Sequence, residues 1–247
     1  LAELTTDSAL AGNDPSMIHA LSKINFIVAR SLLETRRAVE SQRYFDESRK
    51  LLDQVLLHTP NNVQLLAESA TLDRGLGMAT GAQGKLAEAT KLFESALATQ
   101  IRLSDPDTDN LAQKIQVADT RSILAMAYHY AGDFDRAIEQ YIQTISEYQA
   151  IVESNPGDHS TQSLIVGQRF KLAELQMLSD RWGDARQTIT SASGELAVLN
   201  DNQQLEGIVA TYRTLLSHSE EILSKLEGVP STTDTETGDC FALLWGA

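Results

Sequence analysis

The sequence has little cysteine, few prolines and no long apolar run. Its single cysteine, Cys240, cannot form an intramolecular disulfide or a multi-thiolate metal site, which excludes a disulfide framework and a zinc module. The longest apolar stretches, 24–29 and 241–247, fall far short of the roughly 20 residues of a membrane-spanning helix. We therefore expect a soluble segment without direct membrane insertion. Because it begins with Leu1, we expect a cytoplasmic or periplasmic part of a larger protein.

Basic residues are scarce as well. The 247 residues include 20 Lys and Arg against 34 Asp and Glu, which gives a net charge of −14. A surface this acidic repels the phosphates of a nucleic acid. We expect no nucleic-acid partner. The acidity deepens toward the C-terminus, whereas residues 1–60 are almost neutral.

The spacing of apolar residues is typical of helices. Between prolines 15, 60, 106, 156 and 230, apolar residues recur at intervals of three and four, as in Leu86, Ala89, Phe93 and Ala96. This spacing gives each helix one apolar face. No run of alternating β-branched residues indicates a strand. The predicted fold class is all-α, with helices over 15–40, 44–58, 62–81, 85–103, 108–131, 134–154, 158–179, 182–199 and 201–226.

The helical blocks repeat. Ala89, Ala137 and Ala185 lie 48 residues apart. A small residue precedes each of them by twelve positions, and a large one follows by four. The small residues are Gly77, Ala125 and Ala173, and the large ones are Phe93, Tyr141 and Ile189. A weaker first copy centres on Ser48, and its distance to Pro60 predicts an ordinary, short second helix.

The best copy consists of Leu124, Ala125, Tyr128, Gly132, Phe134, Ala137 and Tyr141, and it resembles the tetratricopeptide repeat family. The resemblance implies a right-handed α-solenoid of antiparallel helix pairs over about 15–58, 62–103, 108–154 and 158–199, with a capping helix over 201–226. The 48-residue period is similar to that of long variants in bacterial signalling proteins. We expect one domain over 15–227, a disordered segment over 1–14, and a disordered tail over 228–247 whose apolar end, 240–247, either docks or frays.

Two segments imitate ligand-binding motifs. Residues 77–85 resemble a phosphate loop, but Ala79 replaces its first glycine and Leu86 stands where Ser or Thr would coordinate magnesium. Residues 105–110 resemble a calcium loop, but Gln116 replaces the bidentate Glu. We expect Asp107 or Thr108 to cap the next helix instead. No metal or cofactor is predicted.

The sequence does not bring residues with catalytic side chains together. The histidines, at 19, 58, 129, 159 and 218, fall in separate repeats, and Cys240 has no neighbouring base. We therefore expect no enzyme.

Binding is the remaining function. In the family that this chain resembles, the first helix of each pair lines a concave groove. The resemblance carries groove positions to Arg30, Arg37, Arg74, Met78, Asp119, Met126, His129, Tyr130, Phe170, Glu174 and Met177, together with Leu33, Glu40, Thr71, Ser122 and Leu178. This groove changes from basic to apolar and acidic, which predicts a peptide or partner helix as its ligand.

Alternatives to this groove stay open. Met126, Phe170 and Met177 fit equally well as core residues of long helices. A structural homodimer without a foreign ligand is the main alternative function, and a small-ligand sensor or enzyme is a second one.

Overall fold

The described part of the chain is built from helices alone. The computed structural model describes residues 14–104, 110–199 and 205–226, and in these ranges it contains no strand. The helices are α2 (Pro15–Glu34), α3 (Ala38–His58), α4 (Val63–Gly81), α5 (Leu86–Leu103), α6 (Leu111–Tyr130), α7 (Phe134–Ser154), α8 (His159–Leu178), α9 (Trp182–Leu199) and α10 (Glu206–Leu226). The predicted all-α fold class is confirmed.

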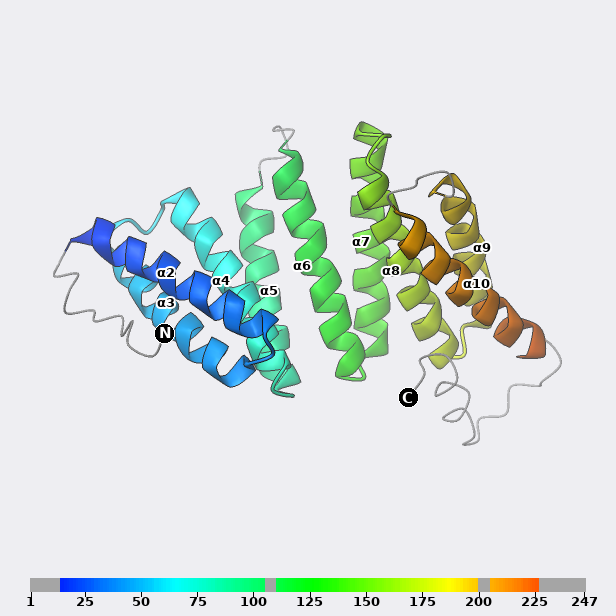
Figure 1. The fold of residues 1–247 in the computed structure, drawn as a ribbon, viewed down its shortest axis with the longest axis horizontal. Coiled ribbons are helices and arrows are strands. Elements are labelled where there is room, and N and C mark those ends of the chain that lie inside the picture. Colours follow the sequence, from blue (N-terminus) through cyan, green and yellow to red (C-terminus); the bar gives the residue numbers. More distant parts are fainter. Residues whose placement is uncertain (1–13, 105–109, 200–204, 227–247) are drawn as a thin grey trace. The chain divides into compact units, whose positions relative to one another are not determined.

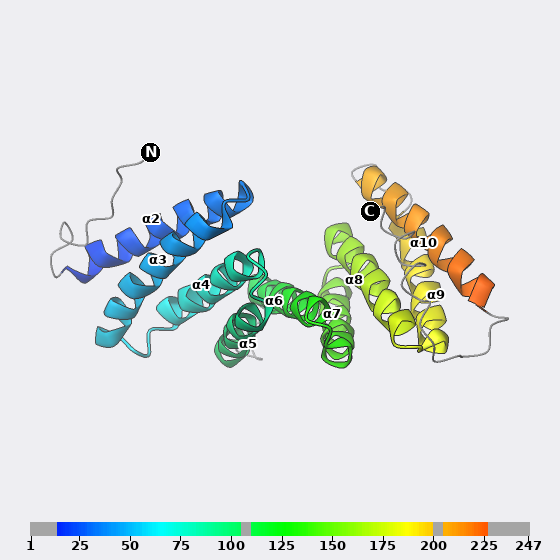
Figure 2. The same cartoon turned by 90° about the horizontal axis from the view of Figure 1, so that it is seen from below.

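The helices fall into two compact units, residues 1–133 and 134–247. In the first unit, α2 packs against α3, α3 against α4, α4 against α5 and α5 against α6 (Figures 1 and 2). In the second unit, α7 packs against α8 and α8 against α9, while α10 crosses α8 and α9. The boundary falls inside the predicted pair 108–154, and the single domain over 15–227 stays a prediction. The predicted disordered segments, 1–14 and 228–247, lie outside the described residues except for Asp14.

Helices α2, α4, α6 and α8 begin at a side-chain cap. The capping residues are Asp14, Asn62, Asn110 and Asp158, whose side-chain oxygens accept backbone N–H bonds at 3.0 to 3.2 Å. Each cap satisfies an amide that has no partner within its helix. The predicted cap of α6 was wrong, because Asn110 takes this place and the helix begins only at Leu111.

The turn after the first helix of each predicted pair has a residue with positive φ. These residues are Arg36 (61°), Gly84 (80°), Gly132 (77°) and Asp180 (57°). They lie 48 residues apart. The left-handed conformation lets the chain leave one helix and start the next within a few residues. At positions 84 and 132, glycine adopts this conformation without a steric penalty.

The first pair differs from its prediction. Helix α2 ends at Glu34 and α3 begins at Ala38, so the predicted helices 15–40 and 44–58 were wrong at their junction. With 21 residues, α3 is also longer than predicted. Ser41, 48 residues before Ala89, takes the anchor position, and its hydroxyl donates a 2.7 Å bond to the carbonyl of Ala29.

The predicted anchor, Ser48, lies seven residues too far along α3. Two helical turns take ~7.2 residues, so both serines lie on the same face of the helix. Ser48 is buried too, with its hydroxyl 3.1 Å from that of Ser22. Both registers therefore satisfy the apolar pattern, and only the position of the turn distinguishes them.

Small residues allow large ones to approach between neighbouring helices. Ala89, Ala137 and Ala185 are all at most 1% exposed. A Cβ atom on Gly77 would lie only 2.6 Å from the ring of Phe93, and one on Gly75 would lie 2.6 Å from the ring of Phe45. The glycines thus supply the space that the aromatic rings occupy.

Candidate functional site

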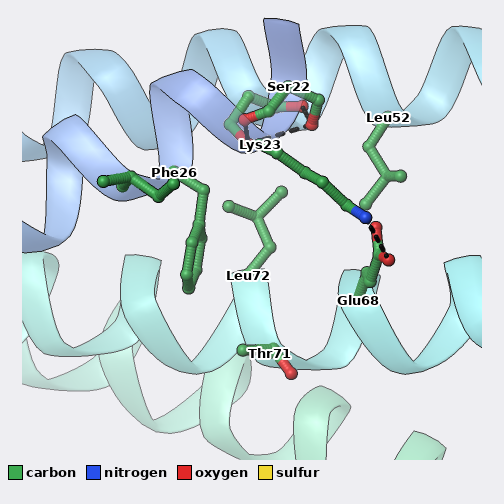
Figure 3. A pocket seen from close by; sticks show the side chains of 9 residues that line it. Ser22, Lys23, Phe26, Leu52, Glu68, Thr71 and Leu72 are labelled. Atoms are coloured by element: carbon green, nitrogen blue, oxygen red, sulfur yellow. Dashed lines mark hydrogen bonds and ion pairs between the residues drawn. The ribbon is translucent and has the colours of Figure 1, made fainter. Parts of the chain in front are cut away.

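Two adjoining pockets lie between α2 and α4 in the first unit. We call them together the α2–α4 groove. The first pocket, of about 300 Å³, is lined by Ser22, Lys23, Phe26, Ile27, Ser48, Leu52, Glu68, Thr71 and Leu72 (Figure 3). The second, of about 350 Å³, is lined by Phe26, Arg30, Leu33, Glu34, Phe45, Thr71, Arg74, Gly75 and Met78. Because Phe26 and Thr71 line both, the two pockets adjoin.

The floor of the groove is apolar and fixed by the core. Leu52 from α3 and Leu72 from α4 are at most 2% exposed. The ring of Phe26 meets that of Phe45 edge to face at 5.7 Å. Gly75 has no side chain to fill the second pocket above Phe45. A rigid apolar floor of this kind can accept an apolar side chain without rearrangement.

The first pocket has a charged rim, at Glu68. Its carboxylate lies 2.5 Å from Nε2 of His19 and 3.2 Å from Nζ of Lys23, and the pair with Lys23 is visible in Figure 3. Burial alone would raise the pKa of Glu68, but hydrogen bonds with His19, Lys23 and Gln64 outweigh burial and lower the pKa. Glu68 is therefore a satisfied, ionised carboxylate that ties α4 to α2.

The second pocket is lined by two arginines, of which one has an acidic partner. Arg30 pairs with Glu34 on the same helix at 3.7 Å. Arg74, half-buried on α4, makes no ion pair or hydrogen bond with any residue that the structure describes. Arg74 therefore lines the second pocket without a carboxylate partner among the described residues.

Three residues of the predicted groove, Arg30, Arg74 and Met78, meet in the second pocket, together with Leu33 and Thr71. Arg37 lies elsewhere, in the turn before α3. It donates a 2.8 Å bond from Nε to Glu40, and this bond raises the pKa of Arg37 and lowers that of Glu40.

The register error explains the missed groove residues. The predicted α2 positions were Arg30, Leu33, Arg37 and Glu40, and moving each back by seven residues gives Lys23, Phe26, Arg30 and Leu33. All four of the shifted residues line the groove. The turn at Arg36 is the signal that would have revealed them, but it contains neither glycine nor proline.

The predicted groove residues of α6 form a separate group. His129 stacks on Tyr130, with ring centroids 5.5 Å apart, and Tyr130 is 67% exposed. Asp119 and Met126 are half-buried. None of these four residues lines the α2–α4 groove.

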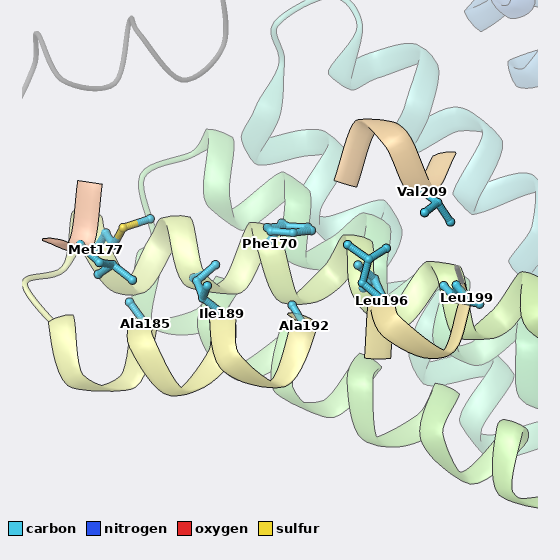
Figure 4. Close-up of a cluster of buried hydrophobic side chains, with 11 residues drawn as sticks. Phe170, Met177, Ala185, Ile189, Ala192, Leu196, Leu199 and Val209 are labelled. Carbon is cyan, nitrogen blue, oxygen red and sulfur yellow. The ribbon is translucent and has the colours of Figure 1, made fainter. Parts of the chain in front are cut away.

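On α8, the structure places the predicted groove residues under α10. Phe170 and Met177 are 7% and 3% exposed, and they belong to a core cluster with Val209 and Leu223 of α10 (Figure 4). The ring of Phe170 lies 5.6 Å from that of Tyr212, also on α10. Both residues therefore pack in the core instead of lining an open groove, which corrects their predicted position.

Glu174, the third of these residues, is half-buried beside Lys171. Burial lowers the pKa of Lys171, and the negative charge of Glu174 partly opposes this effect.

A smaller pocket, of about 210 Å³, was missed by the sequence analysis. It lies in the second unit and is lined by Gln149, Val152, Glu153, Gln162, Ile165, Glu195 and Val198. Arg169 holds Glu195 through two hydrogen bonds of 2.7 and 2.8 Å. This bidentate pair joins α8 to α9.

Within the described ranges, neither a metal site nor a membrane-spanning helix is found. In residues 14–104, 110–199 and 205–226, no three His, Cys, Asp or Glu side chains gather as metal ligands. Over the same ranges, none of the helices has the length and apolarity to cross a membrane. Residues 105–109 of the calcium-like segment and the apolar end 240–247 lie outside the described part of the chain.

Comparisons with known proteins support the repeats. A family model described as "Tetratricopeptide repeat" matches residues 74–108 and 117–159, which confirms the predicted family. The crystal structure of BtubC (BKLC) from P. vanneervenii is similar in fold, with a TM-score of 0.55 at 14% identity over 92% of this chain and 89% of that one.

A de novo designed helical repeat protein, DHR64, reaches a TM-score of only 0.30 at 12% identity, over 87% of this chain and 100% of its own. That similarity is too low to support an argument. No curated protein matches the chain.

Proposed function

We propose that this chain, which carries tetratricopeptide repeats, is a protein-interaction module that receives a peptide or partner helix in its α2–α4 groove. The family as a whole suggests an interaction or scaffold role and is generally non-enzymatic. The observation that supports the groove as the site is the pair of adjoining pockets with an apolar floor and a charged rim. A role as the regulatory region of a bacterial signalling protein is a finer proposal that rests only on the long repeats.

The groove suits a polypeptide better than a small metabolite. Two pockets in a row can receive two side chains of one segment, since neighbouring side chains on one face of a helix are ~6 Å apart. The apolar floor would supply most of the affinity, and the charged groups would fix the register of the bound segment. A polypeptide can also bind along an elongated, open groove, without a closed cavity around it.

Blocking the groove tests the proposal. Thr71 lines both pockets and is half-buried, so Thr71→Arg places a long side chain across them. Short random peptides displayed on phage are selected on the wild-type protein, and the affinities of the enriched peptides are measured for wild type and variant. We expect Thr71→Arg to weaken binding by about tenfold or more, a loss of at least ~1.4 kcal/mol.

The matched control is Ser31→Arg, which adds the same charge and bulk at an exposed position of α2 outside both pockets. We expect it to bind the peptides as the wild type does. Peptides that bind all three proteins equally would show that the groove is not the site.

A further inference from the structure

The groove contains one charge that the described structure leaves uncompensated. Glu68 is held by His19 and Lys23, and Arg30 pairs with Glu34. Arg74 alone, among the charged residues that line the groove, has no counter-ion in the described part of the chain.

A guanidinium in this position favours an anion. Arginine keeps its positive charge at any physiological pH, and its planar fork matches the two oxygens of a carboxylate. Arg74 is half-buried, and its pocket also contains Leu33, Phe45 and Met78. Apolar surroundings weaken the competition from water, so a carboxylate that reaches Arg74 gains more than it would at an open surface.

From this we infer the chemistry of the partner. The segment that occupies the groove carries an Asp or Glu side chain that pairs with Arg74, beside a large apolar side chain that enters the first pocket. This inference rests on the proposed function, because it names the ligand of the same groove.

The spacing of the two features follows from α4. Thr71, which lines the first pocket, and Arg74 are three residues apart, which is roughly 5 Å along the helix axis. A bound helix would match this spacing with residues three or four apart, and an extended segment with residues one or two apart. A basic segment is disfavoured, because Glu68 already has its cations and Arg74 would meet a like charge.

The test uses peptides selected from a displayed random library on the full chain. We expect the enriched peptides to combine an acidic residue with a large apolar one at this spacing. Arg74→Gln should weaken their binding by about tenfold, as expected for a lost charge-assisted pair. Arg102→Gln, which removes an exposed charge from α5 outside the groove, should leave the affinity unchanged.

A second measurement keeps the test independent of the folding of the variant. Changing the acidic residue of the peptide to its amide should weaken binding to the wild-type chain by the same factor. The amide peptide should then bind the Arg74→Gln chain almost as tightly as it binds wild type, because the two changes remove the same interaction.

The outcomes separate the two proposals. If the enriched peptides are basic, or if they bind Arg74→Gln as well as wild type while failing to bind Thr71→Arg, this inference is overturned and the groove remains the site. If no peptide is enriched, or if every peptide binds Thr71→Arg normally, the proposed function falls together with the inference.

Discussion

At the level of single residues, buried polar groups connect the first two helix pairs. Asp73 on α4 is 7% exposed and forms an ion pair with Arg49 of α3. It also accepts a 3.0 Å bond from Ser95 of α5. A buried carboxylate is costly unless its lone pairs are satisfied, and here α3 and α5 both supply partners. The network therefore fixes α4, and with it the wall of the groove, relative to its neighbours.

Gly77 is a position where a single added methyl group should disrupt the packing. Alanine would place its Cβ 2.6 Å from the ring of Phe93, which is only 4% exposed and has little room to move. Overpacking of this kind costs about 1–3 kcal/mol, whereas the gain in helix propensity is about 1 kcal/mol. We expect Gly77→Ala to lower the free energy of unfolding by up to about 2 kcal/mol, measured by urea denaturation with circular dichroism.

Gly81, on the same helix, provides the control for Gly77. A Cβ atom there meets only Ala89 at an ordinary 3.5 Å. Gly81→Ala should leave the stability unchanged or raise it by up to about 1 kcal/mol. Equal effects of the two substitutions would contradict the tight contact between Gly77 and Phe93.

Glu68 should make stability depend on pH. Burial opposes its ionisation, but its hydrogen bonds outweigh burial and lower its pKa below the ordinary value of 4.5. A carboxyl group with a lowered folded pKa stabilises the fold above that ordinary value and loses this contribution as the pH falls through the folded pKa. We expect wild type to be more stable than Glu68→Gln near neutral pH, and this difference to shrink below pH 4.5.

The measurement for Glu68 is urea denaturation of both proteins at several pH values. Glu88→Gln is the control, since Glu88 is exposed on α5 and has no ion pair in the described residues. It reports the effect of removing one negative charge that makes no contact with α2. A constant difference for Glu68→Gln would show that its contacts with α2 contribute nothing.

At the level of elements, the position of each helix depends on its turn more than on its apolar pattern. The turns at Gly84 and Gly132 were predictable, because glycine favours positive φ. The turn at Arg36 was not, since arginine rarely adopts this conformation and the apolar pattern continues across it at the same phase. For this reason two of the four predicted groove positions, Arg37 and Glu40, lie outside α2, whereas Arg30 and Leu33 line the α2–α4 groove.

The packing of α10 over α8 could not be predicted from the sequence either. Phe170 and Met177 have the spacing of groove residues and of core residues alike. Their environment depends on where α10 packs, and a helix with a broad apolar face can cover more than one neighbour. Helix existence and fold class follow from local periodicity, whereas the burial of a particular face depends on contacts between distant segments.

The start of α8 provides a prediction at this level. Asp158 accepts a 3.0 Å bond from the backbone N–H of Thr161 and a 2.6 Å bond from its hydroxyl, and these bonds lower the pKa of Asp158. Removing a capping side chain typically costs about 1 kcal/mol. We expect Asp158→Ala to destabilise the second unit by this amount, and Asp158→Asn, which retains a capping oxygen, by only a few tenths.

Tryptophan fluorescence suits the measurement on Asp158, because Trp182 lies at the start of α9 and packs against the core of the second unit. Urea denaturation followed at this signal should show the loss for Asp158→Ala. Equal stability of the alanine variant and wild type would mean that the cap is replaced by water.

At the level of the whole molecule, the acidity is unevenly distributed. Residues 1–133 contain 13 basic and 17 acidic residues (13 − 17 = −4), and residues 134–247 contain 7 and 17 (7 − 17 = −10). The α2–α4 groove, which includes Arg74, therefore belongs to the less acidic unit. An acidic partner would meet less repulsion there than on the second unit, and salt would screen what repulsion remains.

The same net charge bears on self-association, the main alternative to a foreign partner. Two copies that each carry −14 repel one another, and the groove offers only two small pockets to a second copy. We therefore expect a monomer of 27.0 kDa by size-exclusion chromatography with light scattering across a wide concentration range. A dimer that Thr71→Arg dissociates and Ser31→Arg preserves would assign the groove to self-association. It would then be a second copy of this chain, instead of an acidic segment of another protein, that supplies the carboxylate to Arg74.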